Sequence, residues 1–356
     1  MSTTTTPSVT QSKCAQCQAP TQKKCAGCSS QLDDETQAFT YYCNQSCQAK
    51  YWKSHMSSCK AHQARKRLYR AGDTLQEIFY RYRHAMFDKK IVKIERKNGK
   101  LYIHEGEYPD MTSNLDILHD FPEKLVQNKE DKQAILTFLA AFDAIAWMKD
   151  ATELLLKGTS KKIEEIVFTT KNTKREVQRV GPAKERDDFV YPNTVFKVTL
   201  QSNGGIYILD LSGAQYGYYS PVTPWSQYID NRVSQIKSCY PLGTAQTQIS
   251  WINVVPNLTA FAIQMNQGCS RALKMGMEEW ESNSMGVLEF LRLPREEFAI
   301  QRGMLYFVIQ VLLLRSQGHV NEKARKAREN PGASSTAVFT PGEFEEGVKE
   351  MVQLLM

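Results

Sequence analysis

Long apolar runs are scarce in the sequence, and we expect no helix that crosses a membrane. Its longest apolar run, Met304 to Leu314, is interrupted only by Gln310, whereas a spanning helix needs about 20 residues. The N-terminus, MSTTTTPSVTQSK, is polar and has no apolar core of the kind that a secretory signal requires. We therefore expect an intracellular protein, in the nucleus or the cytoplasm, with no membrane partner and with Met304 to Leu314 in a buried core helix.

Cysteine is nearly absent from most of the chain. Seven of the nine cysteines lie between Cys14 and Cys59, and only Cys239 and Cys269 lie elsewhere. A disulfide framework is typical of small secreted proteins, and the N-terminus gives no sign of secretion. The same density of thiols inside a cell indicates a metal site. We expect the two remote cysteines to be small buried hydrophobic residues.

The motifs of several enzyme classes are also missing. The chain contains no glycine-rich phosphate loop and no Gly-x-Ser-x-Gly segment. Its histidines outside the cysteine-rich segment are scattered singly, at positions 84, 104, 119 and 319. We interpret each of these as a surface histidine or a hydrogen-bonded one, and we do not expect them to bind a metal.

The cysteine-rich segment has the spacing of zinc ligands. The ligand pairs are Cys14-x2-Cys17, Cys25-x2-Cys28, Cys43-x3-Cys47 and His55-x3-Cys59. These eight ligands suffice for two tetrahedral zinc ions and leave no position for a reactive water, which predicts structural zinc. The alternatives are free cysteines, or His62 in place of His55, although His62 breaks the spacing.

Residues 14 to 59 resemble a MYND-type zinc finger. The matching residues beyond the first two cysteine pairs are Tyr42, Cys43, Cys47, Gln48, Trp52, His55 and Cys59. The resemblance implies two interleaved sites. One zinc would bind Cys14, Cys17, Cys43 and Cys47, and the other would bind Cys25, Cys28, His55 and Cys59.

MYND fingers bind proteins, mainly through short proline-containing peptides, so the resemblance implies a protein partner. Gln48 and Trp52 lie on a helix-like segment, and we expect them to border the peptide groove; the alternative is that Trp52 only covers the small core. Lys13 to Lys60 has a formal charge of +3, with no arginine. Two zinc ions and seven thiolates change this by −3, so we expect no direct contact with nucleic acid.

The remainder of the chain predicts an α+β fold. We expect an N-terminal MYND-type double-zinc finger, followed by a larger, helix-dominated α+β domain of unknown function with a small antiparallel sheet. The expected segments are a disordered tail (1–12), the finger (13–60), a basic linker (61–72), the α+β domain (73–320), a flexible linker (321–341) and a C-terminal helix (342–356). The basic run at positions 65–70 fits a solvated helix start or linker, and alternatively a nuclear-targeting or acidic-partner patch.

Hydrophobic periodicity and turn residues place the elements of the larger domain. We expect Asp73 to be an N-cap and Lys171 to Arg186 to be an exposed hairpin or loop. The expected helices are 131–158, 225–237, 258–280, 287–293 and 296–316, and the expected strands are 164–169, 194–200 and 206–211, with a hairpin over 90–105.

Residues 193 to 217 weakly resemble a papain-like or transglutaminase-like fold. The resemblance puts Asp210 in the place of the aspartate that orients the catalytic base. However, Asn193 or Thr194 stands where histidine would be, and no cysteine lies between Cys59 and Cys239. We interpret the larger domain as non-catalytic. The alternative is a cysteine hydrolase or transferase, or a lysine methyltransferase, with catalytic residues that the sequence does not reveal.

Overall fold

The computed structural model describes residues 12–28, 39–107, 117–186, 189, 191–202, 204–252, 258–329, 339 and 342–356. Nearly all of the expected disordered tail (1–12) lies outside these ranges. So do most of the loop between Cys28 and Cys43 and residues 330–338 of the expected flexible linker.

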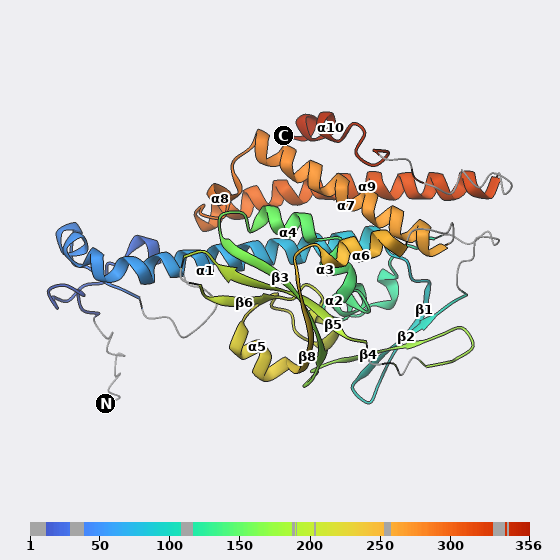
Figure 1. Cartoon of the computed structure of the whole chain (residues 1–356), viewed down its shortest axis with the longest axis horizontal. Helices are drawn as coiled ribbons and strands as arrows, with labels where there is room; N and C mark the ends of the chain where they lie inside the picture. The colour runs from blue at the N-terminus through green and yellow to red at the C-terminus, as the bar shows by residue number, and fades with distance from the viewer. Residues whose placement is uncertain are drawn as a thin grey trace, which may run out of the picture.

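One long helix, α1 (Gln45–Ala85), connects the finger to the body of the molecule (Figure 1). Asn44 caps its N-terminus, because its side-chain oxygen accepts a hydrogen bond of 2.9 Å from the backbone N–H of Cys47. The expected basic linker over 61–72 and the expected N-cap at Asp73 are therefore wrong, since both lie inside α1. Leu68 and Ala71 are fully buried there, so packing against the body continues the helix where charge suggested a linker.

A five-stranded antiparallel sheet lies at the centre of the body, and it confirms the small antiparallel sheet expected from the sequence. Its order is β7-β6-β5-β3-β8. The strands are β3 (Ser160–Thr170), β5 (Asn193–Leu200), β6 (Ile206–Leu209), β7 (Val222–Pro224) and β8 (Val233–Pro241). One face joins the main core through Phe196 and Val198, and the other packs on Tyr228 of α5 (Trp225–Arg232).

A second sheet has the order β1-β2-β4. Its strands β1 (Ile91–Lys97) and β2 (Lys100–Glu105) form the expected hairpin, with Asn98 and Gly99 at positive φ in the turn. The third strand, β4 (Glu176–Val180), pairs with β2 in parallel. The interpretation of 171–186 as an exposed hairpin or loop is therefore wrong in its middle part. Charged side chains are compatible with β4 because it lies at the edge of this sheet.

Most of the remaining helices lie on the α1 side of the sheets, in the upper part of Figure 1. They are α2 (Lys129–Thr137), α3 (Ala141–Ala146), α4 (Lys149–Leu155), α6 (Thr244–Ile252), α7 (Leu258–Asn283), α8 (Val287–Phe290), α9 (Arg295–Glu329) and α10 (Val348–Leu355). Short 3₁₀ helices are η1 (Ala26–Cys28), η2 (Glu123–Leu125) and η3 (Gly213–Tyr216). With the two sheets, these helices confirm the α+β class.

Several expected boundaries are wrong, and the C-terminal helix expected over 342–356 begins only at Val348. The expected helix over 131–158 is divided into α2, α3 and α4, and Leu139 between α2 and α3 has a φ of +58°, which no helix accommodates. The expected helix over 225–237 ends at Arg232, where β8 begins. The expected flexible linker over 321–341 is helical as far as Glu329, because α9 continues beyond its apolar segment.

Helix α9 is buried on one face only. Leu305, Ile309 and Leu312 are buried, whereas Ile300 and Phe307 are exposed. The segment Arg295–Lys326 is long and apolar enough to cross a membrane by length and composition, and 33% of its most apolar window is buried. The expectation of a buried core helix over 304–314 is thus correct for one side of α9. The absence of a membrane partner stays a prediction.

Candidate metal centre

The chain before α1 forms two tight turns that present cysteine pairs. In the first turn the backbone N–H of Cys14 donates to the carbonyl of Ala19 (2.8 Å), and the N–H of Gln18 donates to the carbonyl of Cys14 (2.9 Å). In the second, η1 places Cys28 beside Cys25, and the N–H of Cys28 donates to the carbonyl of Cys25 (2.9 Å). Each turn therefore directs two thiols toward one point.

The first tetrad consists of Cys14, Cys17, Cys43 and Cys47. Their sulfur atoms lie within 4.8 Å of one another. The Sγ of Cys43 is 3.5 Å from that of Cys17 and 3.4 Å from that of Cys47. The first turn of α1 supplies Cys47, and the Asn44 cap fixes that turn. The four thiols fit a single tetrahedral zinc ion.

The second tetrad consists of Cys25, Cys28, His55 and Cys59, and all four are buried. The Nε2 of His55 lies 3.2 Å from the Sγ of Cys28. The other ring nitrogen, Nδ1, lies 3.2 Å from the hydroxyls of Thr40 and Ser58. Such a hydroxyl contact orients the imidazole and leaves Nε2 for the metal. His62, the alternative ligand, is in neither tetrad.

The electrostatics of the tetrads favour a bound divalent cation. Burial raises the pKa of Cys28, and the neighbouring thiols of Cys59 and Cys25 raise it further. For Cys14, burial acts in the same direction, but backbone N–H groups outweigh it and lower its pKa to about 6. Burial lowers the pKa of His55, which keeps the imidazole neutral. A soft donor set of thiolates and imidazole, with no carboxylate, suits zinc rather than magnesium or calcium.

The two sites are interleaved along the chain. The first and third ligand pairs meet in one tetrad, and the second and fourth meet in the other. Helix α1 contributes Cys47 to the first site and both His55 and Cys59 to the second. The two structural zinc sites therefore share a single rigid element, and α1 carries that element into the body.

Gln48 and Trp52 lie on α1 beside the ligands of the second tetrad. Trp52 is 37% exposed, and its ring meets that of His55 edge-on at 6.2 Å between centroids. Gln48 is half-buried, with its Nε2 4.0 Å from the Sγ of Cys25. Tyr42, and not Trp52, is the aromatic residue in the buried cluster of the finger. Met56, one turn after Trp52, is also 37% exposed; the i, i+4 spacing predicts this neighbour, which the sequence interpretation missed.

The segment 193–217 contains a buried polar network. The carboxylate of Asp210 accepts hydrogen bonds from the hydroxyl of Tyr228 (2.7 Å) and from the backbone N–H of Ser212 (3.1 Å). Burial raises the pKa of Asp210. The hydroxyl of Thr194 donates to the backbone carbonyl of Ala141 at the start of α3 (2.7 Å). Ala141, which has no nucleophilic side chain, thus lies beside the start of β5. Asp210 stabilises the turn that follows β6.

The two remote cysteines differ from each other. Cys269 is fully buried, as expected, and burial raises its pKa to about 12. Cys239 is exposed on the edge strand β8, so the expectation that it is buried is wrong. An edge strand has no neighbour on one side, and the sequence does not reveal which strand lies at the edge.

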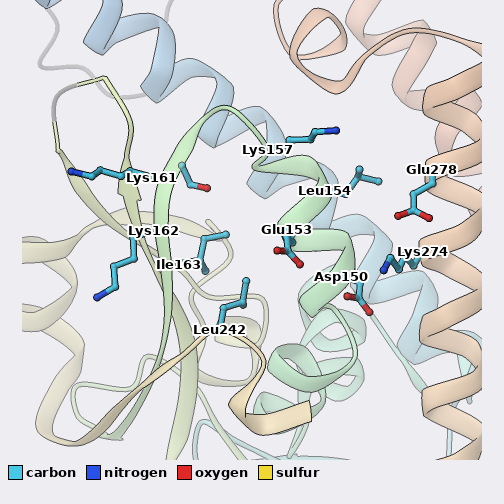
Figure 2. Close-up of a pocket in the computed structure, with 11 residues that line it drawn as sticks. Asp150, Glu153, Leu154, Lys157, Lys161, Lys162, Ile163, Leu242, Lys274 and Glu278 are labelled. Carbon is cyan, nitrogen blue, oxygen red and sulfur yellow. The ribbon is translucent and has the colours of Figure 1, made fainter. Parts of the chain in front are cut away.

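A surface hollow of about 540 Å³ lies between α4, the start of β3 and α7. Figure 2 shows residues that line it. Asp150 and Glu153 of α4 face Lys274 and Glu278 of α7, while Lys161 and Lys162 extend to the opposite side. The hydroxyl of Ser160, which also lines the hollow, donates to the backbone carbonyl of Leu156 (3.1 Å). No histidine or cysteine is among the described lining residues, so this hollow does not present a nucleophile with its base.

Comparison with known proteins identifies one segment. The family model of the MYND finger matches residues 14–59, the same residues that hold the two tetrads. No curated protein and no solved structure matches the chain. None of the comparisons supports the resemblance of residues 193–217 to a papain-like or transglutaminase-like fold.

Proposed function

Residues 14–59 are a MYND finger with two structural zinc sites, and we propose that this finger recruits a partner protein by binding a short proline-containing peptide. The observation that carries the proposal is the exposed apolar surface of Trp52 and Met56 on α1. Both side chains are partly exposed beside the second zinc site, so they are available to a ligand. Aromatic residues that are exposed in this way are typical anchors of protein interfaces.

The larger domain acts in this proposal as a non-catalytic scaffold in the nucleus or the cytoplasm. Helix α1 supports this role, because it holds the finger at a fixed orientation relative to the body. A partner bound at Trp52 would therefore meet a defined surface of the larger domain as well. The balance of charge in the metallated finger supports a protein partner over a nucleic acid.

The test is a titration of the zinc-loaded protein with labelled proline-containing peptides, followed by fluorescence anisotropy. Trp52→Ala should weaken binding by about thirtyfold, the loss of a typical aromatic anchor. The matched control is Trp251→Ala, since Trp251 is 74% exposed on α6 and lies in another part of the body. Equal peptide binding by wild type and Trp52→Ala, with the zinc content still two per chain, would refute the proposal that Trp52 borders the peptide groove.

A further inference from the structure

Basic side chains gather where α1 meets α8 and the start of α9. Figure 1 shows α8 beside the finger-proximal half of α1. The guanidinium of Arg70 donates to the backbone carbonyls of Leu291 (3.1 Å) and Leu293 (2.6 Å). Its Cζ lies 4.3 Å from the ring centroid of Phe298, and the Cζ of Arg302 lies 5.2 Å from the same centroid. We call Lys66, Arg67, Arg70, Arg292 and Arg302 the basic cluster.

The charge of the basic cluster is not neutralised within the described part of the chain. None of its five members forms an ion pair with a carboxylate there, whereas the buried Arg83 pairs with both Asp88 and Asp143. The Nε of Arg67 is buried and has no hydrogen-bond acceptor among the described residues. An uncompensated group of this kind costs folding free energy.

The charges of the cluster members lower the pKa values of their neighbours. Partial burial lowers the pKa of Arg67, and the charge of Arg292 lowers it further. Burial and the charge of Arg302 act in the same way on the pKa of Arg70. Burial and Arg70 lower the pKa of Lys66. Arg70 also has a structural role, as a cap for the carbonyls that follow α8.

We propose that the basic cluster binds an acidic or phosphorylated segment of the protein that the finger recruits; this inference rests on the proposed function. Carboxylates and phosphates are the ligands for which clustered guanidinium groups are best suited, because they accept paired N–H donors. Such a segment would supply the negative charge that the described residues do not.

The shape of the site favours a peptide over a nucleic acid. The cluster is compact, and Arg67 and Arg70 are partly buried between helices, so a narrow extended chain reaches them more easily than a duplex. Lys66 and Arg70 follow Trp52 on the same helix, at about 21 and 27 Å along its axis. A partner therefore needs at least about six to eight extended residues between its proline-containing and its acidic parts.

The experiment uses the full-length, zinc-loaded protein and three labelled probes. The probes are a peptide with four phosphoserines, hexaglutamate, and an oligodeoxythymidine of the same charge as the phosphopeptide. The double variant Arg67→Gln/Arg292→Gln removes two charges from the cluster. The matched control is Lys161→Gln/Lys237→Gln, because both lysines are exposed and neither forms an ion pair in the described part of the chain.

The proposal expects the cluster variant to bind the phosphopeptide at least about tenfold more weakly than wild type, and the control variant to bind it normally. Binding of hexaglutamate would show that carboxylates are sufficient ligands for the cluster. Absence of hexaglutamate binding would restrict the ligand to a phosphorylated segment. The midpoint of thermal unfolding of the ligand-free cluster variant should stay equal or rise, since repulsion is removed. A lower midpoint would show that the cations serve the fold and would contradict the proposal.

Two further outcomes overturn the inference. One is equal phosphopeptide binding by wild type and the cluster variant. The other is tighter binding of the oligodeoxythymidine than of the phosphopeptide through the same arginines, which would assign the site to nucleic acid. The variant Trp52→Ala distinguishes this proposal from the proposal for the finger. It should weaken binding of the proline-containing peptide and leave binding of the phosphopeptide unchanged.

Discussion

Removal of zinc should unfold the finger and the first part of α1, and leave the rest of α1 intact. The buried cluster of the finger consists of Cys14, Cys25, Cys28, Cys59 and Tyr42. Four of these five are zinc ligands. Tyr42 is then the one large apolar side chain in that cluster, and its burial contributes about 2–3 kcal/mol. That is far below the conformational entropy of the finger, at about 1–2 kcal/mol for each ordered backbone residue.

The boundary of this unfolding follows from the packing of α1. From Gln45 to Cys59 the buried residues of α1 are the zinc ligands His55 and Cys59. From Ala64 onward, α1 packs into the main core of the body through Leu68, Ala71 and Leu75. An unsupported helix of about 15 residues is marginal in water. Hydrogen exchange should therefore become fast over residues 45–60 and stay slow over 68–85.

The assay is hydrogen exchange with mass spectrometry, before and after treatment with a zinc chelator. Restoring zinc should restore protection over residues 45–60, which controls for irreversible damage. Unchanged protection in this segment after complete loss of zinc would refute the argument that metal supplies the stability of the finger. Loss of protection over 68–85 would show that the body depends on the metal too.

Two further predictions concern the body. Gly72→Ala should destabilise the fold by about 1–2 kcal/mol, because a Cβ there would lie closer than 3.0 Å to the Cγ2 of Val222. Its control, Gly303→Ala, has no atom within 4 Å of the new Cβ and should instead stabilise the fold by up to about 1 kcal/mol. Thermal unfolding measures both changes, and a change of the same sign in the two variants would contradict the prediction. Tyr228→Phe should cost about 1–3 kcal/mol by removing the hydrogen bond to Asp210. Because burial raises the pKa of Asp210 in the folded state, the carboxyl stabilises the fold fully below its unfolded pKa and less as the pH rises. Tyr228 donates a stronger hydrogen bond to the ionised carboxylate than to the neutral acid. Urea unfolding should therefore show a larger cost for Tyr228→Phe at pH 7 than at pH 4.5, and an equal cost at both would contradict a raised pKa of Asp210.

Local signals account for the elements that the sequence predicts well. Asn98 and Gly99 form the two-residue turn between β1 and β2, and this pair of residues favours such a turn over most other structures. The alternation in β5 and the apolar run in α9 follow from periods of two and 3.6 residues. The finger is predictable for a similar reason, since ligand spacing within a turn is a local property.

Non-local contacts account for the elements that the sequence predicts poorly. Charge at Arg67 and Arg70 suggests a linker, but burial of Leu68 and Ala71 makes the same segment part of a helix. Residues 233–237 have a composition that fits a helix, and pairing with β3 makes them a strand. In both cases, the deciding partner lies far away in the chain.

By itself, the sequence determined the zinc chemistry of this protein: the donor types, their spacing and the number of ions follow from residues 14–59. Only the tertiary structure decided that α1 runs unbroken from the finger into the body. The structure also decided that cations far apart in the chain, at positions 66–70 and at 292 and 302, lie together. The physical reason is that metal ligands must converge over a few residues of a turn, whereas burial and charge repulsion depend on segments that the fold alone brings together.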